Sequence, residues 1–203
     1  MLLNLNSPFL FYILETIGIL SFFISGAMLA KKKDFDPIGV YIIGFVTAFG
    51  GGTIRDVLLD NHPLYWIQHS EYPLIFFLLA AIVYYFDMSL KDSRLLIPDA
   101  LGIATFGITS TQLALHSDLP LVIVPIIAVV SACFGGVLRD LLCTQTPFIF
   151  QKESFYAMVV FLGSVFYLAL KFVSVNTHLN AAICFVAMVL FRLLAMKYSW
   201  RFR

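Results

Sequence analysis

Charged residues are scarce in this sequence: Lys, Arg, Asp and Glu together make up 12% of its 203 residues. A soluble domain carries about 25% charged residues. A chain that is 61% hydrophobic has too little polar surface to cover a water-exposed exterior. The shortage therefore excludes a soluble globular protein. The net charge of +1 provides no field to attract nucleic acid, and we expect no nucleic-acid partner.

Cysteine is also rare, and sequence motifs of known catalytic chemistry are missing. Cys133, Cys143 and Cys184 lie in or beside apolar segments without CxxC spacing, which favours small core side chains over disulfides or metal ligands. The chain contains no P-loop, no dinucleotide-binding GxGxxG and no HExxH or GxSxG motif,. We therefore expect no catalytic residue, no cofactor and no bound metal.

Long hydrophobic runs are what the sequence has in abundance. Crossing a hydrocarbon core of about 30 Å takes about 20 apolar residues. Seven such runs are present: Phe9–Ala30, Ile38–Leu59, Tyr72–Leu90, Leu95–Leu115, Leu121–Cys143, Ser154–Phe172 and Leu179–Tyr198. They leave no room for a soluble domain. The sequence predicts an all-α integral membrane protein of seven transmembrane helices, with residues 1–203 forming a single membrane domain in a lipid bilayer.

The Lys and Arg residues between the runs predict the orientation. With the N-terminus outside, nine of them fall on the inner side and one, Lys171, on the outer side. The nine are Lys31, Lys32, Lys33, Lys91, Arg94, Lys152, Lys197, Arg201 and Arg203. Because cytoplasmic loops are enriched in these residues, we expect an outer N-terminus and a cytoplasmic C-terminus. The lysines follow the first run instead of preceding it, which is the reverse of a signal peptide.

An internal repeat divides the chain. The segment Gly51–Leu58 (GGTIRDVL) recurs 84 residues later as Gly135–Leu142 (GGVLRDLL), and the same offset pairs Glu15 with Asp99 and Tyr72 with Tyr156. Each copy holds three runs, so the second copy must be inverted in the membrane. Inverted repeats are typical of transport proteins, although duplication can also serve only to build a bundle. We expect repeats at residues 9–90 and 95–172 and an additional helix at 179–198.

The repeated glycines have two interpretations. They are Gly50, Gly51 and Gly52 in the second run and Gly135 and Gly136 in the fifth. Glycine weakens a helix and permits a kink, and an irregular backbone inside a membrane is tolerated only where it is buried in protein or lines a watery cavity. A kinked, pore-lining helix is one interpretation. Close helix packing through small residues is the other.

Six charged residues are expected at membrane depth, where they are costly unless paired or hydrated. They are Glu15, Arg55, Asp56, Asp99, Arg139 and Asp140. Neighbours in a helix do not face each other, so we expect each Arg to pair across the repeats, or with Glu15 and Asp99, and not with the Asp beside it. Such pairs could be structural latches or part of a pathway. Glu15 and Asp99 could also attract cations or carry protons.

Other polar residues within the runs are weaker indicators. Hydroxyl groups such as Thr109 and Ser131 could line a hydrated path or bond their own helix backbone. Arg192, in the last run, is expected to reach the cytoplasmic surface with its long side chain. The four histidines are expected in solvated outer loops.

The doubled motif resembles the bacterial branch of the trimeric intracellular cation (TRIC) channel family, also labelled a glycine transporter family, and the resemblance covers essentially the whole chain. It implies a homotrimer in the bacterial inner membrane, with a pore in each protomer that conducts K⁺ or Na⁺. It also implies a pore lined by the two glycine motifs, with the Arg-Asp pairs beside them. Phe134 stands where the first copy has Gly50, so the two kinks need not be equal.

The leading hypothesis is therefore a passive monovalent cation channel. A secondary transporter of a small amino acid such as glycine would use the same architecture and remains the alternative. A scaffold or assembly factor is disfavoured by the buried charges.

Overall fold

A computed structural model describes residues 8–86, 92–117, 119–151 and 155–198. This part of the chain forms eight α-helices and one 3-10 helix, joined by turns and short loops. In chain order they are α1 (Pro8–Lys32), α2 (Pro37–Leu58), α3 (Tyr65–Gln68), α4 (Glu71–Tyr85), α5 (Asp92–Leu115), α6 (Ile123–Leu142), η1 (Phe148–Phe150), α7 (Tyr156–Phe172) and α8 (Thr177–Lys197).

Each predicted run overlaps one of the seven longer helices, and the two differ at their ends. The helix α4 ends at Tyr85, and most of the remainder of the run predicted to Leu90 lies outside the described residues. The helix α2 begins where Asp36 accepts a hydrogen bond from the Gly39 amide at 2.7 Å and Pro37 occupies the first turn, both common helix-start features. The residues between two apolar runs therefore define the start of the next helix as well as the loop before it.

Length and composition qualify four of the described helices to cross a membrane, namely α1, α2, α6 and α8. The helices α4 and α7 are apolar but shorter. By the same measures α5 is long but less apolar. Large hydrophobic side chains cover much of the exterior of the bundle, as expected for a surface whose solvent is lipid.

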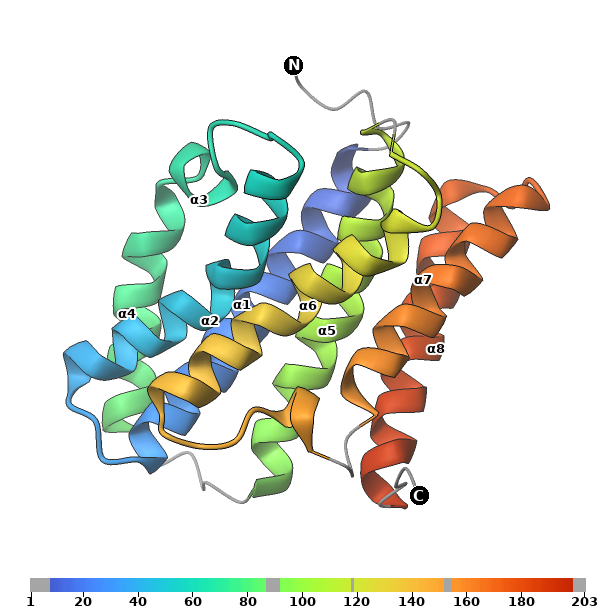
Figure 1. The fold of residues 1–203 in the computed structure, drawn as a ribbon. Helices are drawn as coiled ribbons and strands as arrows, with labels where there is room; N and C mark the ends of the chain where they lie inside the picture. Colours follow the sequence, from blue (N-terminus) through green and yellow to red (C-terminus); the bar gives the residue numbers. More distant parts are fainter. Residues whose placement is uncertain (1–7, 87–91, 118, 152–154, 199–203) are drawn as a thin grey trace.

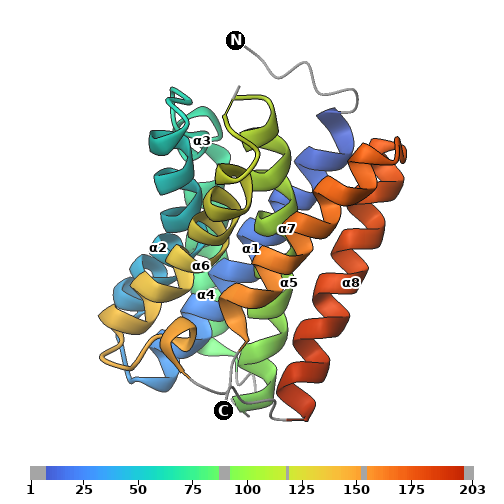
Figure 2. The same ribbon diagram turned by 45° about the vertical axis from the view of Figure 1, so that its right-hand side comes forward.

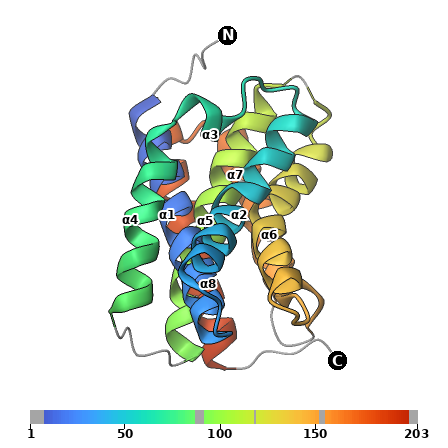
Figure 3. The ribbon, with the colours of Figure 1, turned by 90° about the vertical axis from the view of Figure 1, so that its left-hand side faces the viewer.

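The helices form one bundle around α1 and α5. The helix α1 packs against α2 and α5, and α2 and α5 both pack against α6. Figure 1 shows α1 running from top to bottom and α5 from bottom to top. The helices α3 and α4 flank one side of the bundle (Figure 3), and α8 lies at the opposite edge beside α7 (Figure 2).

Equivalent glycines allow α1 and α5 to approach each other closely. A Cβ on Gly18 would overlap the Thr105 side chain of α5, and a Cβ on Gly102 would overlap the Phe22 ring of α1. The Phe22 and Phe106 rings then meet at 5.2 Å between centroids. The two central helices are thus held by matching positions from the two repeats.

Two short helices were not predicted. The helix α3 and the 3-10 helix η1 follow α2 and α6, at positions about 84 residues apart. Four and three residues are too few for a periodic hydrophobic pattern. Both fold back beside the charged ends of the preceding long helices, where they contribute to the site.

Candidate functional site: two buried charge clusters

The first cluster joins α1 to α2. Arg55 Nη1 lies 2.8 Å from Glu15 Oε1, and Arg55 Nε donates to Asp56 Oδ1 at 2.9 Å. All three side chains are at least 90% buried. Two carboxylates against one guanidinium give the first cluster a formal charge of −1.

The chain after α2 holds the Asp56 carboxylate in place. Its Oδ2 accepts from the Tyr65 backbone amide at 3.2 Å, and its Oδ1 accepts from Asn61 Nδ2 at 3.4 Å. The Asn61 amide also bonds the Asp56 carbonyl at 2.8 Å. These bonds explain why α3 folds back: a buried carboxylate must find donors, and this segment supplies them.

The second cluster repeats the arrangement between α5 and α6. Arg139 Nη1 lies 2.7 Å from Asp99 Oδ1, and Arg139 Nε donates to Asp140 Oδ1 at 2.8 Å. Asp140 accepts from the Phe148 amide of η1 at 3.1 Å and from Gln145 Nε2 at 3.0 Å. Its carboxylate is therefore held as the Asp56 carboxylate is, by the turn that follows the helix.

One equivalent pair of tyrosines behaves differently in the two clusters. Tyr156 donates its hydroxyl to Asp99 Oδ1 at 3.1 Å, whereas the hydroxyl of Tyr72 shares a hydrogen bond of 2.8 Å with Thr16. A tyrosine hydroxyl thus donates a hydrogen bond to the acid of the second cluster, Asp99, whereas Glu15 of the first cluster receives no such bond from Tyr72.

The charge pairing was partly predicted. The pairs of Arg55 with Glu15 and of Arg139 with Asp99 are confirmed, and both lie within one repeat. The expectation that each Arg would not pair with its neighbouring Asp was wrong. The guanidinium sits on a long stem that curls around the helix to the short neighbouring carboxylate. Across the repeats, Arg139 Nη1 donates to Ser25 of α1 at 2.7 Å.

The motif glycines lie where α2 and α6 cross. A Cβ on Gly51 would overlap the Ser131 carbonyl oxygen, and a Cβ on Gly135 would overlap the Thr47 carbonyl oxygen. Each helix therefore contacts the backbone of the other through its glycine. Helical geometry continues through both motifs, although α2 changes direction along its length (Figure 1).

The other motif glycines contact side chains. An added Cβ on Gly50 would lie 2.7 Å from Leu138, one on Gly52 would lie 3.3 Å from Phe106, and one on Gly136 would lie 2.6 Å from the Tyr156 hydroxyl. Side chains can move aside more easily than a helix backbone can, so Gly51 and Gly135 are the more restrictive positions.

A cavity of about 360 Å³ opens beside the first cluster. Glu15 and Arg55 line it, together with residues of α3, the preceding loop and α5. Its wall is formed by Phe11, Tyr12, Asn61, His62, Pro63, Tyr65, Gln68, His69, Thr109, Gln112 and Leu113. The sequence had suggested a solvated loop for His69, but its ring packs on Tyr65 with centroids 4.3 Å apart.

Several buried oxygen atoms find no hydrogen-bond partner within the described part of the chain. Thr109 Oγ1 lies in the cavity wall, Ser131 Oγ near the helix crossing and Asp99 Oδ2 in the second cluster. Because buried polar groups nearly always find a partner, these atoms mark places suited to water or an ion. By contrast, Thr47 and Thr105 bond carbonyls of their own helices.

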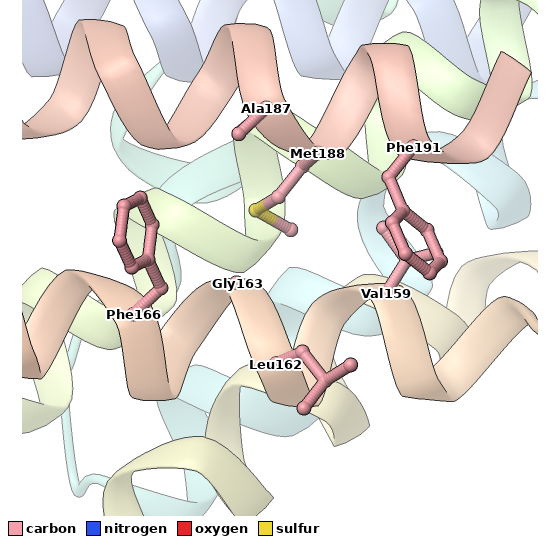
Figure 4. A pocket seen from close by; sticks show the side chains of 7 residues that line it. All are labelled: Val159, Leu162, Gly163, Phe166, Ala187, Met188 and Phe191. Atoms are coloured by element: carbon pink, nitrogen blue, oxygen red, sulfur yellow. The ribbon is translucent and has the colours of Figure 1, made fainter. Parts of the chain in front are cut away.

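A second cavity is apolar and separate from both clusters. It measures about 160 Å³ between α7 and α8. Figure 4 shows Met188 of α8 projecting toward Gly163 of α7, with Phe166 and Phe191 at the two ends. No charged residue lines this cavity, so it belongs to the packing of α8.

The structure also places Arg192 and the three cysteines. Arg192 is 2% exposed and lies 4.9 Å from the Tyr156 ring centroid, so the expected extension to the surface is wrong. A cation–π contact inside the protein holds it instead. The three cysteines are buried and free, as the sequence indicated.

The fold and the two clusters define an α-helical membrane protein with equivalent intramembrane charge sites in its two halves. A family model described as glycine transporter matches residues 12–88 and again residues 96–172, two segments displaced by the same 84 residues. One family model therefore matches both halves of the chain, and each matched segment includes one copy of the Gly-Gly-x-x-Arg-Asp motif.

Curated relatives match along nearly the whole chain. The membrane protein YvgT of Bacillus subtilis is 32% identical over 194 residues, covering 93% of each chain. The inner membrane protein YadS of Escherichia coli K12 is 31% identical over 192 residues, with the same coverage. Both carry the name UPF0126.

Solved structures give the same assignment. The TRIC channel orthologue of Rhodobacter sphaeroides superposes with a TM-score of 0.88 at 32% identity, covering 94% of this chain and 99% of that one. A prokaryotic TRIC channel in 0.5 M KCl gives 0.87 at 30% identity, covering 95% and 98%. The chain belongs to the bacterial TRIC family, which the family model describes as glycine transporters, and it is a multi-pass membrane protein.

Proposed function

We propose that this protein is a channel for monovalent cations, K⁺ or Na⁺, with one pathway inside each protomer of a homotrimer in the bacterial inner membrane. The structural relatives are named as TRIC channels, one of them as a trimeric intracellular cation channel. This chain is 32% identical to that one, in a match that covers 94% of this chain. The three-helix repeats at 9–90 and 95–172 are inverted, and the additional helix at 179–198 completes seven crossings. The N-terminus is outside and the C-terminus cytoplasmic.

The observation that carries this proposal is the set of partnerless oxygens at three places. Thr109 lies in the cavity, Ser131 near the helix crossing and Asp99 in the second cluster. Hydroxyl and carboxylate oxygens replace part of the hydration of a cation, and conduction needs several weak sites instead of one strong site. We infer that the pathway runs from the cavity past the helix crossing to the second cluster.

The charged residues have separate roles in this proposal. Arg55 and Arg139 act as latches that hold Asp56 and Asp140 and keep the helix ends in place. Glu15 and Asp99 face the pathway and attract cations, since one carboxylate oxygen of each receives no hydrogen bond from the described residues. Gly51 and Gly135 set the distance between α2 and α6 at the narrow point.

A carrier of small amino acids is the alternative function, and one contact weighs against it. A bound amino acid would need a donor for its carboxylate. Three nitrogens of Arg55 are already within 2.9 Å of Glu15 or Asp56, so capture of a third carboxylate would have to displace one of them.

Flux into proteoliposomes separates the two functions. A channel gives rapid uptake of labelled Rb⁺ down its gradient without a coupled solute. A glycine carrier gives saturable uptake of labelled glycine and no leak of Rb⁺ in its absence. Glycine uptake without Rb⁺ flux would contradict the proposal.

A further inference from the structure

The cavity beside Glu15 combines charge and aromatic rings in a way that conduction of K⁺ does not require. We propose that it is a binding site for small organic ammonium ions, which enter from the face where α1 begins. We expect a bound ammonium ion to obstruct the flow of cations, and this expectation rests on the proposed function. The binding of the ion does not depend on that function.

The base of the cavity carries an excess negative charge. Arg55 occupies one oxygen of Glu15 and is shared with Asp56, so the first cluster keeps a formal charge of −1. Within the described residues no hydrogen bond reaches Glu15 Oε2. A monovalent cation placed there offsets the excess charge, and desolvation of the site strengthens the attraction.

Aromatic rings form much of the wall above that carboxylate. Phe11, Tyr12, Tyr65 and His69 contribute rings, with Tyr12 and His69 centred 5.9 Å apart. Aromatic faces attract quaternary and alkyl ammonium ions. Burial raises the pKa of the Tyr65 phenol well above its usual value, and the Glu15 carboxylate acts in the same direction, so this ring stays neutral.

The size and polarity of the cavity also favour a small organic ammonium ion. A cavity of about 360 Å³ falls within the range of about 300–1,000 Å³ that is usual for small-molecule sites. It holds an ion much larger than K⁺, such as tetramethylammonium. A ligand with its own carboxylate fits less well because Arg55 is already engaged by Glu15 and Asp56.

The second cluster differs at the equivalent place, which makes the proposed site one-sided. There Tyr156 donates its hydroxyl to Asp99 Oδ1, and Arg139 Nη1 bonds the same oxygen. The equivalent tyrosine of the first repeat bonds Thr16 instead. Glu15 lines the cavity, whereas Asp99 does not and is 1% exposed. We therefore expect binding at one face of each protomer only.

The test uses the full-length protein in planar bilayers and in detergent. Tetramethylammonium is added to each side of a single channel in turn, and its binding is measured separately by calorimetry. Tyr12→Leu removes a half-exposed ring and should raise the half-blocking and dissociation constants about fivefold, equivalent to about 1 kcal/mol. Tyr12→Phe keeps the ring and should retain the affinity, and Tyr85→Leu, on an exposed tyrosine of α4, is the matched control.

Block from one side that weakens only in Tyr12→Leu supports the site. Equal block from both sides, or an unchanged affinity in Tyr12→Leu, overturns it. Currents without ammonium binding overturn this inference and leave the channel intact. Ammonium binding to a protein that passes no current supports the site and contradicts the proposed function.

Discussion

Replacing Gly51 with alanine tests the contact between α2 and α6 most sharply. The new Cβ would overlap the Ser131 carbonyl oxygen and lie 3.0 Å from its carbon. Carbon atoms pack favourably at about 3.5–4.0 Å. No rotamer change can relieve a contact between a helix backbone and a Cβ, so the two helices must separate by roughly 1 Å or bend.

The expected loss of stability follows from two opposing terms. Alanine favours a helix over glycine by up to about 1 kcal/mol, whereas overpacking a tight interior costs about 1–3 kcal/mol. With the full helix preference set against this cost, we expect a net loss of up to about 2 kcal/mol for Gly51→Ala. For a chain of about 200 residues, each kcal/mol lowers the midpoint of thermal unfolding by about 2–4 °C.

The neighbouring glycine is the control. At Gly52 the added Cβ would lie 3.3 Å from the Phe106 ring, which can shift slightly, so the same helix preference should leave Gly52→Ala neutral or more stable. Thermal unfolding of both variants in one detergent compares them directly. A Gly51→Ala protein at least as stable as Gly52→Ala would refute the close crossing of α2 and α6.

Three further predictions concern the polar contacts. Arg55→Gln should lower the free energy of unfolding by about 3–5 kcal/mol, because it leaves Glu15 and Asp56 buried without a cation. Adding Glu15→Gln should recover part of this loss in a double-mutant cycle of unfolding free energies. Strictly additive effects would argue against the ion pair. Tyr156→Phe removes a hydrogen-bond donor from the Asp99 carboxylate and should lower the free energy of unfolding by about 1.5–3 kcal/mol, against about 0.5–1.5 kcal/mol for the equivalent Tyr72→Phe. Equal melting temperatures of the two variants would contradict the different roles of these tyrosines. Asp36→Ala should cost about 1 kcal/mol by removing the cap of α2, and a stability unchanged in thermal melts would count against that cap.

Sequence and structure agree best where hydrophobic length decides the outcome. The seven apolar runs correspond to α1, α2, α4, α5, α6, α7 and α8, because the hydrophobic pattern extends over about four or more helical turns in each. The repeat was recognisable because whole motifs recur, and the pairing of Arg55 with Glu15 followed from the cost of an unpaired charge in a membrane.

The features that the sequence did not predict depend on single side chains or on short segments. The curl of Arg55 toward Asp56 depends on its rotamer, which helix periodicity does not determine. The helix α3 was too short to predict, and the cavity that it helps to line could therefore not be predicted either. The glycine motifs permitted either a kink or close packing, and the contact of Gly51 with Ser131 became visible only with both helices in place.

Recording single channels of the purified protein in a planar bilayer under a KCl gradient is the direct test of cation conduction. We expect discrete unitary currents that reverse near the K⁺ equilibrium potential, since Glu15 and Asp99 favour cations over anions. Currents that reverse near the Cl⁻ potential would contradict it. So would silent bilayers that contain folded, inserted protein.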